Sequence, residues 1–181
     1  NVSCPTTGSN PATSNGITMT TGSTDIATAA ISGSPFDQGE SLSVPFTACA
    51  SFNGGNVFTA ELSDAFGVFG APVAIGTLTS TTPGGVINAT IPPGTAAGTL
   101  YRIRVVSSDP VYTGTDNGTN LTVKAFLNYY WVGGTGNWTN LARWASASGG
   151  AGSAHIEPPS QYNNVFFDAN SGAGTVTVDA A

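Results

Sequence analysis

The sequence of 181 residues predicts an all-β protein built around a β-sandwich. The first observation is the alternation along residues 98–108. Tyr101, Ile103 and Val105 fall on one face of an extended chain, and Arg102 and Arg104 fall on the other. The second observation is a repeated pattern of short apolar runs separated by turn residues, drawn from 24 glycines and 11 prolines. Together the two patterns indicate strands joined by tight turns.

About seven strands are expected between residues 26 and 125, the number found in an immunoglobulin-like or fibronectin-III-like sandwich. The apolar runs place them at residues 26–31, 41–48, 57–63, 72–79, 86–91 and 98–108, and around Leu121 and Val123. Pro45 falls inside the second of these strands. Because proline has no N–H to donate to a ladder, a sheet edge or a bulge is expected there.

Tyr101 is expected to turn its hydroxyl back onto the backbone just upstream, near the turn at residues 93–95. An ordinary strand tyrosine is the alternative. If the sandwich topology holds, strand 98–108 lies beside strand 57–63. Arg102 or Arg104 can then pair with Glu61 across the two strands.

The charge of the chain narrows the choice of partners. Charged residues make up only 8% of the sequence, the net charge is −6, and Lys124 is the only lysine. Nucleic acids and anionic lipids both attract clusters of basic residues, so neither partner is expected.

No apolar run is long enough to span a bilayer, and the first residues lack the features of a signal peptide, which fits a mature or excised secreted fragment. A weakly charged surface rich in Ser, Thr and Asn is typical of extracellular bacterial repeat proteins.

Three segments are expected along the chain. Residues 1–25 are polar and indicate a linker or the end of a preceding module. Residues 26–125 form the sandwich. Residues 126–181, which contain all three tryptophans, form a second β module whose completeness is left open. If the protein is secreted, a disulfide between Cys4 and Cys49 is expected, and two unrelated thiols are the alternative.

The tryptophans of the second module are candidate ligand-binding residues. Trp131, Trp138 and Trp144 fall close together in a stretch rich in glycine. Two interpretations stay open. The rings build the core of a small module, or they form an aromatic platform for sugar rings.

A calcium site is the second candidate. Asp116 and Asn117, with Asp109, supply oxygen atoms of the kind that calcium accepts. The spacing is not that of an EF-hand loop, and Asp-Asn-Gly at residues 116–118 is also a common turn. Apart from calcium, no cofactor is expected.

No catalytic pattern is found. His155 is the only histidine, and no Gly-x-Ser-x-Gly elbow accompanies it, so a hydrogen-bonded or solvent-exposed histidine is expected. One histidine and two distant cysteines cannot make a standard zinc site. The sequence also lacks nucleotide-binding fingerprints. We therefore expect no enzyme activity.

Several motifs carry a resemblance. Residues 55–64 read GNVFTAELSD, residues 89–92 read ATIP and residues 101–108 read YRIRVVSS. With these motifs, residues 31–123 resemble an Ig-like repeat of very large secreted proteins from Bacteroidetes-type bacteria. Residues 130–144, YWVGGTGNWTNLARW, together with NVFFDAN at 164–170, resemble a glycine/tryptophan repeat of the same kind of protein.

Those proteins include gliding-motility adhesins of the SprB type and other type IX-secreted surface proteins. The resemblance implies display at the cell surface, with adhesion or filament building as the function and other copies of the modules as partners. The leading hypothesis is therefore a non-enzymatic structural and interaction segment of a secreted surface protein. The alternative, suggested by the tryptophans, is an accessory carbohydrate-binding module of a secreted polysaccharide-degrading enzyme, with polysaccharide as the partner.

Overall fold

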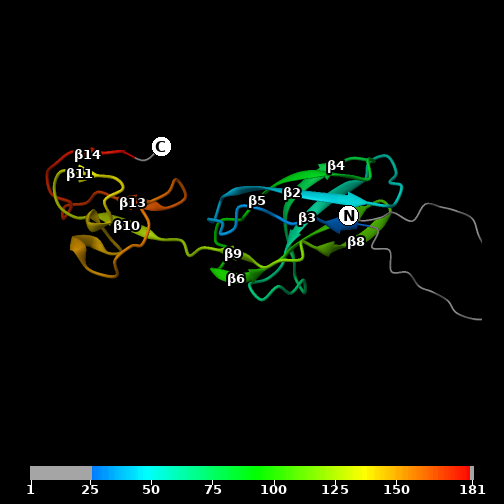
Figure 1. The fold of residues 1–181 in the computed structure, drawn as a ribbon, viewed down its shortest axis with the longest axis horizontal. Helices are drawn as coiled ribbons and strands as arrows, with labels where there is room; N and C mark the ends of the chain where they lie inside the picture. Colours follow the sequence, from blue (N-terminus) through cyan, green and yellow to red (C-terminus); the bar gives the residue numbers. More distant parts are fainter. Residues whose placement is uncertain (1–25, 180–181) are drawn as a thin grey trace, which may run out of the picture. The chain divides into compact units, whose positions relative to one another are not determined.

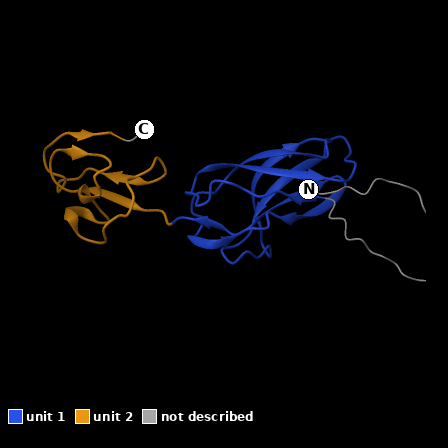
Figure 2. Ribbon diagram, in the orientation of Figure 1, with its two compact units in different colours: residues 1–124 blue, residues 125–181 orange. Residues whose placement is uncertain are grey.

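The computed structural model describes residues 26–179 and divides the chain into two compact units (Figure 1; Figure 2). Unit 1 ends at Lys124 and unit 2 begins at Ala125. The expected linker at residues 1–25, including Cys4, lies outside the described residues. Apart from two short 3-10 turns, at Leu141–Arg143 and Ser148–Gly150, the regular structure described is β-strand, as predicted. Among the described residues, no helix is long and apolar enough to cross a membrane.

Nine strands of unit 1 are labelled in chain order: β1 (Ile26–Thr28), β2 (Ser41–Ala48), β3 (Val57–Leu62), β4 (Val73–Thr79), β5 (Gly84–Thr90), β6 (Gly98–Tyr101), β7 (Ile103–Ser108), β8 (Val111–Asp116) and β9 (Leu121–Val123). Seven of them form one curved sheet in the order β4-β3-β7-β8-β1-β2-β5, while β6 pairs with β9 (Figure 1). β1 pairs antiparallel with β2 on one side and parallel with β8 on the other. This short strand therefore joins the two layers of the sandwich.

The two edge strands of this sheet approach each other at Gly76. A Cβ atom on Gly76 of β4 would lie 2.5 Å from the carbonyl oxygen of Asn88 and 2.9 Å from the Cα of Ala89, both in β5. Such a close approach of two backbones requires glycine. The sheet is therefore nearly closed, and the fold is an all-β sandwich with barrel-like closure.

The predicted inward faces form the core of unit 1. Alternate residues of the strands point inward and exclude water, which is the main favourable contribution to folding. Val73 is an exception at 49% exposure, because it lies at the outer end of β4 opposite the last residue of β3. The buried residues predicted from the alternation are Leu42, Val44, Phe46, Ala48, Phe58, Ala60, Leu62, Ile75, Ile87, Ala89, Ile91, Tyr101, Ile103, Val105, Leu121 and Val123.

The expectation of a sheet edge or bulge at Pro45 was wrong. β2 is an interior strand, and its register with β5 runs through Pro45 without a shift. The carbonyl of Pro45 accepts a hydrogen bond from Ala29, just beyond the end of β1. In an antiparallel strand the N–H and C=O of one residue point the same way. The missing N–H therefore faces Ala29, and the ladder between β1 and β2 ends at this point.

Up to residue 179, unit 2 forms five short strands: β10 (Asn128–Trp131), β11 (Gly136–Asn137), β12 (Trp144–Ala145), β13 (Asn164–Phe166) and β14 (Val176–Thr177). One sheet has the order β12-β10-β13, and β11 pairs with β14. Tyr129, Trp131 and Trp144 are buried at its centre, with Leu127 and Val165 among the residues packed around them. Unit 2 is thus a small β module with its own core.

Candidate functional site

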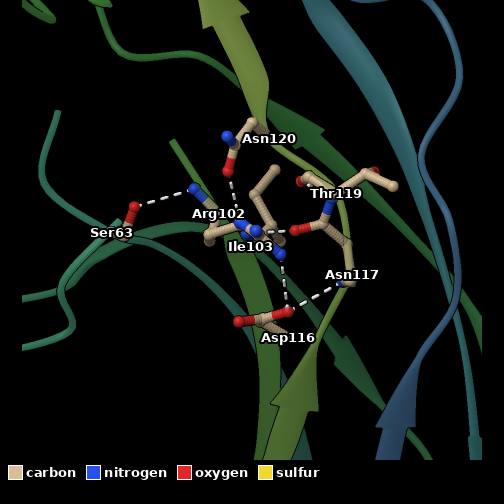
Figure 3. Close-up of polar contacts among 8 residues, drawn as sticks. Ser63, Arg102, Ile103, Asp116, Asn117, Thr119 and Asn120 are labelled. Carbon is tan, nitrogen blue, oxygen red and sulfur yellow. Dashed lines mark hydrogen bonds and ion pairs between the residues drawn. The ribbon is translucent and has the colours of Figure 1, made fainter. Parts of the chain in front are cut away.

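The chain changes strand partners at Arg102, between β6 and β7 (Figure 3). Its backbone N–H donates to Oγ of Ser63 at 2.8 Å, and its carbonyl accepts from the N–H of Ser63 at 2.9 Å. Its Nε donates to Oδ1 of Asn120 at 2.8 Å, and its Nη1 lies 3.3 Å from Oδ1 of Asp116. The single strand expected at residues 98–108 is therefore two strands, β6 and β7, held at their junction by side chains.

Asn117 completes this junction from a buried position, with 4% of its surface exposed. Its Oδ1 accepts from the N–H of Ile103 at 2.9 Å, and its Nδ2 donates to the carbonyl of Thr119 at 2.7 Å (Figure 3). Its own N–H donates to the carbonyl of Ile103 at 2.9 Å. Asn117 therefore takes the place of a strand partner for Ile103 on the β8 side, while Leu62 of β3 pairs with Ile103 on the other side.

The three predicted calcium ligands do not meet at one point. Asp116 and Asn117 are adjacent, but Asp109 lies before the other end of β8, where its Oδ1 accepts from Nδ2 of Asn53 at 2.9 Å. Oδ1 of Asp116 accepts from the N–H of Gly118 at 2.7 Å in addition to facing Arg102. Within residues 26–179, no group of three or more His, Cys, Asp or Glu is placed to hold a metal ion. The oxygen atoms of these residues thus serve the turn and the junction.

Other charged side chains of unit 1 also hold the fold together. Arg104 pairs with Glu61 at 2.8 Å across β7 and β3, which is one of the two pairings predicted. The guanidinium of Arg104 also lies 4.4 Å from the centre of the Phe69 ring. Lys124 and Asp37 form an ion pair at 3.0 Å.

Tyr101 forms the backbone hydrogen bond predicted for it. Its hydroxyl donates to the carbonyl of Ala96 at 2.8 Å, one residue beyond the expected turn. Burial, with a smaller contribution from the charge of Asp64, raises the pKa of Tyr101. The hydroxyl therefore stays protonated and keeps its role as donor well into alkaline solution.

The loop between β3 and β4 presents an exposed aromatic side chain, Phe66, with 79% of its surface accessible. Phe66 borders an apolar groove of about 410 Å³. The sequence did not single out this feature, although the run AFGVFGAPV at residues 65–73 is apolar without any alternation. The other residues lining the groove include Leu62, Ala65, Ala71, Val73, Ala96 and Tyr101.

Two of the three tryptophans belong to the core of unit 2. Trp131 and Trp144 are 2% and 3% exposed, and Trp144 packs edge-on against Trp131 and Trp138 with ring centres 4.9 Å apart in each pair. The indole N–H groups of Trp131, Trp138 and Trp144 donate to carbonyl oxygens of Gly134, Pro159 and Trp138, at 3.0, 3.0 and 2.7 Å respectively. Trp138 alone is half-buried. The structure therefore does not form a platform from all three rings.

His155 differs from the expectation of a hydrogen-bonded or exposed side chain. It is 9% exposed and stacks on Tyr129 with ring centres 3.8 Å apart. Its Nε2 is buried and has no hydrogen-bond partner. The ring of His155 is therefore held against the aromatic core of unit 2.

The outer face of β10 and β13 carries the half-buried Tyr130, the exposed Phe166 and two amide side chains. Tyr130 and Phe166 are opposite each other across the two strands, and their rings stack at 4.6 Å with 14° between their planes. Two residues earlier on both strands, and so on the same face, Nδ2 of Asn164 donates to Oδ1 of Asn128 at 3.2 Å. The alternation of residues 128–131 could have indicated that Tyr130 points away from Tyr129 and Trp131.

Cys49 is disulfide-bonded, while Cys4, its predicted partner, lies outside the described residues. Comparison with protein-family models, with curated proteins and with solved structures finds no match for this chain. The class of protein is therefore defined by its fold and sites alone. It is an all-β protein of two units, with structural ion pairs in unit 1 and exposed aromatic side chains on both units.

Proposed function

We propose that the chain is a non-enzymatic interaction segment of a secreted bacterial surface protein that acts in adhesion or filament building. The observation that supports it best is the contrast between its charged and aromatic groups. Glu61, Asp116 and Asp37 are engaged in ion pairs within unit 1, while Phe66 stands in solvent. Ordered aromatic side chains at a surface are the usual anchors of protein contacts.

The division into two units supports the same proposal. Each unit has a hydrophobic core of its own, and the two follow each other directly in the chain. Domains linked in this way can be repeated many times, which suits a protein that extends from a cell surface. The weak charge and the resemblance to Ig-like and glycine/tryptophan repeats point in the same direction.

Beads coated with the full chain test the proposal. Their retention under flow is compared on surfaces coated with the same chain, with bacterial surface polysaccharide and with albumin. Retention above the albumin level on either of the first two surfaces supports an adhesive segment. Equal retention on all three, or substrate turnover that scales with chain concentration in hydrolase assays, contradicts it.

A second candidate function, binding of a neutral polysaccharide, is favoured by the outer face of β10 and β13. The Tyr130–Phe166 pair offers apolar ring surface, and the Asn128–Asn164 pair offers amide groups beside it. Sugar rings present an apolar face and hydroxyl groups together, so this combination of neutral groups matches them. This second candidate function retains the sugar ligand expected from the sequence, but it places the binding site on the outer face of β10 and β13 and not at the tryptophans.

Affinity electrophoresis in gels containing neutral polysaccharides tests this second candidate. Migration of the wild-type chain should be retarded, and Tyr130→Ala should remove the retardation. Ile156→Ala is the matched control, since Ile156 is an apolar side chain of unit 2 that is 92% exposed and lies on neither strand. Retardation that persists in Tyr130→Ala, or disappears equally in the control, rejects this face as the binding site.

A further inference from the structure

The loop between β3 and β4 holds Phe66 in a fixed position. Oδ1 of Asp64 accepts from the N–H groups of Phe66 and Val68 at 2.9 and 2.8 Å. The backbone of Asp64 donates to the carbonyl of Val68 at 3.0 Å and accepts from the N–H of Gly67 at 3.1 Å. Gly67 has φ +81°, which other residues rarely adopt. The loop is therefore ordered before any partner arrives.

The two phenylalanines of this loop differ in their exposure to solvent. Phe69 is covered by the guanidinium of Arg104, whereas Phe66 is 79% exposed. A Cβ on Gly67 would lie 2.9 Å from the carbonyl oxygen of Leu100, so the loop packs closely onto β6. Leaving a phenyl ring in water on a rigid support loses hydrophobic stabilisation that contact with a partner recovers at little entropic cost.

The apolar groove lies directly beside this ring. Its volume of about 410 Å³ exceeds the roughly 150 Å³ cavity that holds a benzene ring, so it can accept a phenyl group. Asp64 is the charged residue that lines it, and the carboxylate is engaged with the loop N–H groups. The groove therefore suits an apolar occupant.

We propose that two copies of the chain associate through this face, with Phe66 of each copy seated in the groove of the other. A projecting side chain and a matching groove on one face are self-complementary, which is the requirement for a two-fold symmetric contact. Val73, at 49% exposure, and Leu100, at 42%, extend the apolar patch. This inference rests on the proposed function in one respect: it takes a second copy of the chain as the partner.

The size of the patch sets the strength of this contact. Stable complexes bury about 800 Å² on each partner, more than one phenyl ring and a few small neighbours supply. The dimer is therefore weak and reversible when single chains meet in solution. Many copies displayed on one surface associate more strongly, because each contact raises the local concentration for the next.

Sedimentation equilibrium of the full chain over a wide concentration range tests the contact. The weight-average mass of the wild type rises with concentration toward that of a dimer, and Phe66→Ser remains monomeric. Val111→Ser is the matched control, because Val111 on β8 has the same 79% exposure and does not line the groove. A wild type that stays monomeric, or equal association of the wild type and Phe66→Ser, or equal loss in both variants, overturns the inference.

A mixing experiment tests the arrangement itself. Ala71→Glu places a carboxylate in the groove, at an exposed position where the fold tolerates it, and should remove self-association. An equimolar mixture of Ala71→Glu and Phe66→Ser should regain part of it, because Phe66 of the first variant fits the groove of the second, which keeps the rest of its lining. A mixture no more associated than either variant alone overturns the reciprocal arrangement.

The bead assay separates failure of this inference from failure of the proposed function. If wild-type beads adhere to polysaccharide while the chain stays monomeric, only the Phe66 contact is wrong. If the chain neither associates nor adheres to any surface above the albumin level, the proposed function is wrong as well.

Discussion

Replacing Asn117 by alanine should destabilise unit 1 far more than the same replacement of an exposed residue in its turn. The substitution removes two groups: the acceptor of the Ile103 N–H and the donor to the Thr119 carbonyl. The side chain of Ile103 is fully buried. A buried N–H left without a partner costs about 1–3 kcal/mol, and the second lost bond adds about 0.5–1 kcal/mol. We expect the free energy of unfolding to fall by about 2–3 kcal/mol.

Asn120→Ala is the matched control for this prediction. Asn120 is the same residue type in the same turn, but its bond to Arg102 is exposed, so the expected loss is below about 1 kcal/mol. Unit 1 has no tryptophan, and unit 2 has all three. Urea unfolding is therefore monitored with two signals. Tryptophan fluorescence reports the unfolding of unit 2, and far-ultraviolet circular dichroism also reports the unfolding of unit 1. Equal destabilisation by both substitutions, or a shift confined to the fluorescence transition, would refute the role of Asn117 as a strand partner.

Three further predictions concern Tyr101, Trp144 and His155. Because the folded-state pKa of Tyr101 lies above its ordinary value of 10.0, the stabilisation from the neutral hydroxyl is complete below that pH and is lost as the pH rises through the folded pKa. Tyr101→Phe should therefore cost about 1 kcal/mol at neutral pH and reduce the loss of stability above pH 10, measured by urea unfolding at several pH values. An unchanged pH profile would argue against it. Trp144→Ala should cost about 3–5 kcal/mol, enough to unfold a small module, and the remaining tryptophan fluorescence should shift to the red; a native spectrum would show that Trp144 is dispensable. His155→Phe preserves the stacking on Tyr129 and removes the unpaired Nε2, so unit 2 should gain about 1 kcal/mol or more by fluorescence-detected unfolding, and a loss would indicate that Nε2 has a partner in solution.

The layout of unit 1 was largely predictable because its inward faces alternate. Leu42, Val44 and Phe46 repeat every second residue, and this period identifies both the strand and its buried side. β8 was missed because its six residues are exposed or only half-buried, so no apolar period marks them. It is held by backbone pairing with β7 and β1, which depends on residues distant in the sequence.

The candidate sites were less predictable for a related reason. The break at Arg102 leaves the alternation of its neighbours intact, so the sequence shows one strand where the backbone makes two. The difference arises because the side chains of Ser63 and Asn117 bond to the backbone at the junction in place of a neighbouring strand. Ser63 is distant from Arg102 in the sequence, and Asn117 lies in a turn. Likewise, the exposure of an aromatic residue depends on its contacts within a loop: Phe66 is exposed, whereas Phe69, three residues later, is half-buried under the guanidinium of Arg104.

The parallel pairings near the two ends of unit 1 bear on how it responds to mechanical load. β1 runs parallel to β8, and Phe36 bridges in parallel to Val123 in β9. Phe36 donates to the carbonyl of Thr122 at 2.9 Å and accepts from the N–H of Lys124 at 2.8 Å. Tension applied through the two ends of the unit pulls parallel neighbours in opposite directions along their length. Their hydrogen bonds are then strained simultaneously in shear, so rupture requires several to break at once. Forced extension is governed by the rate of that step, and this geometry slows it.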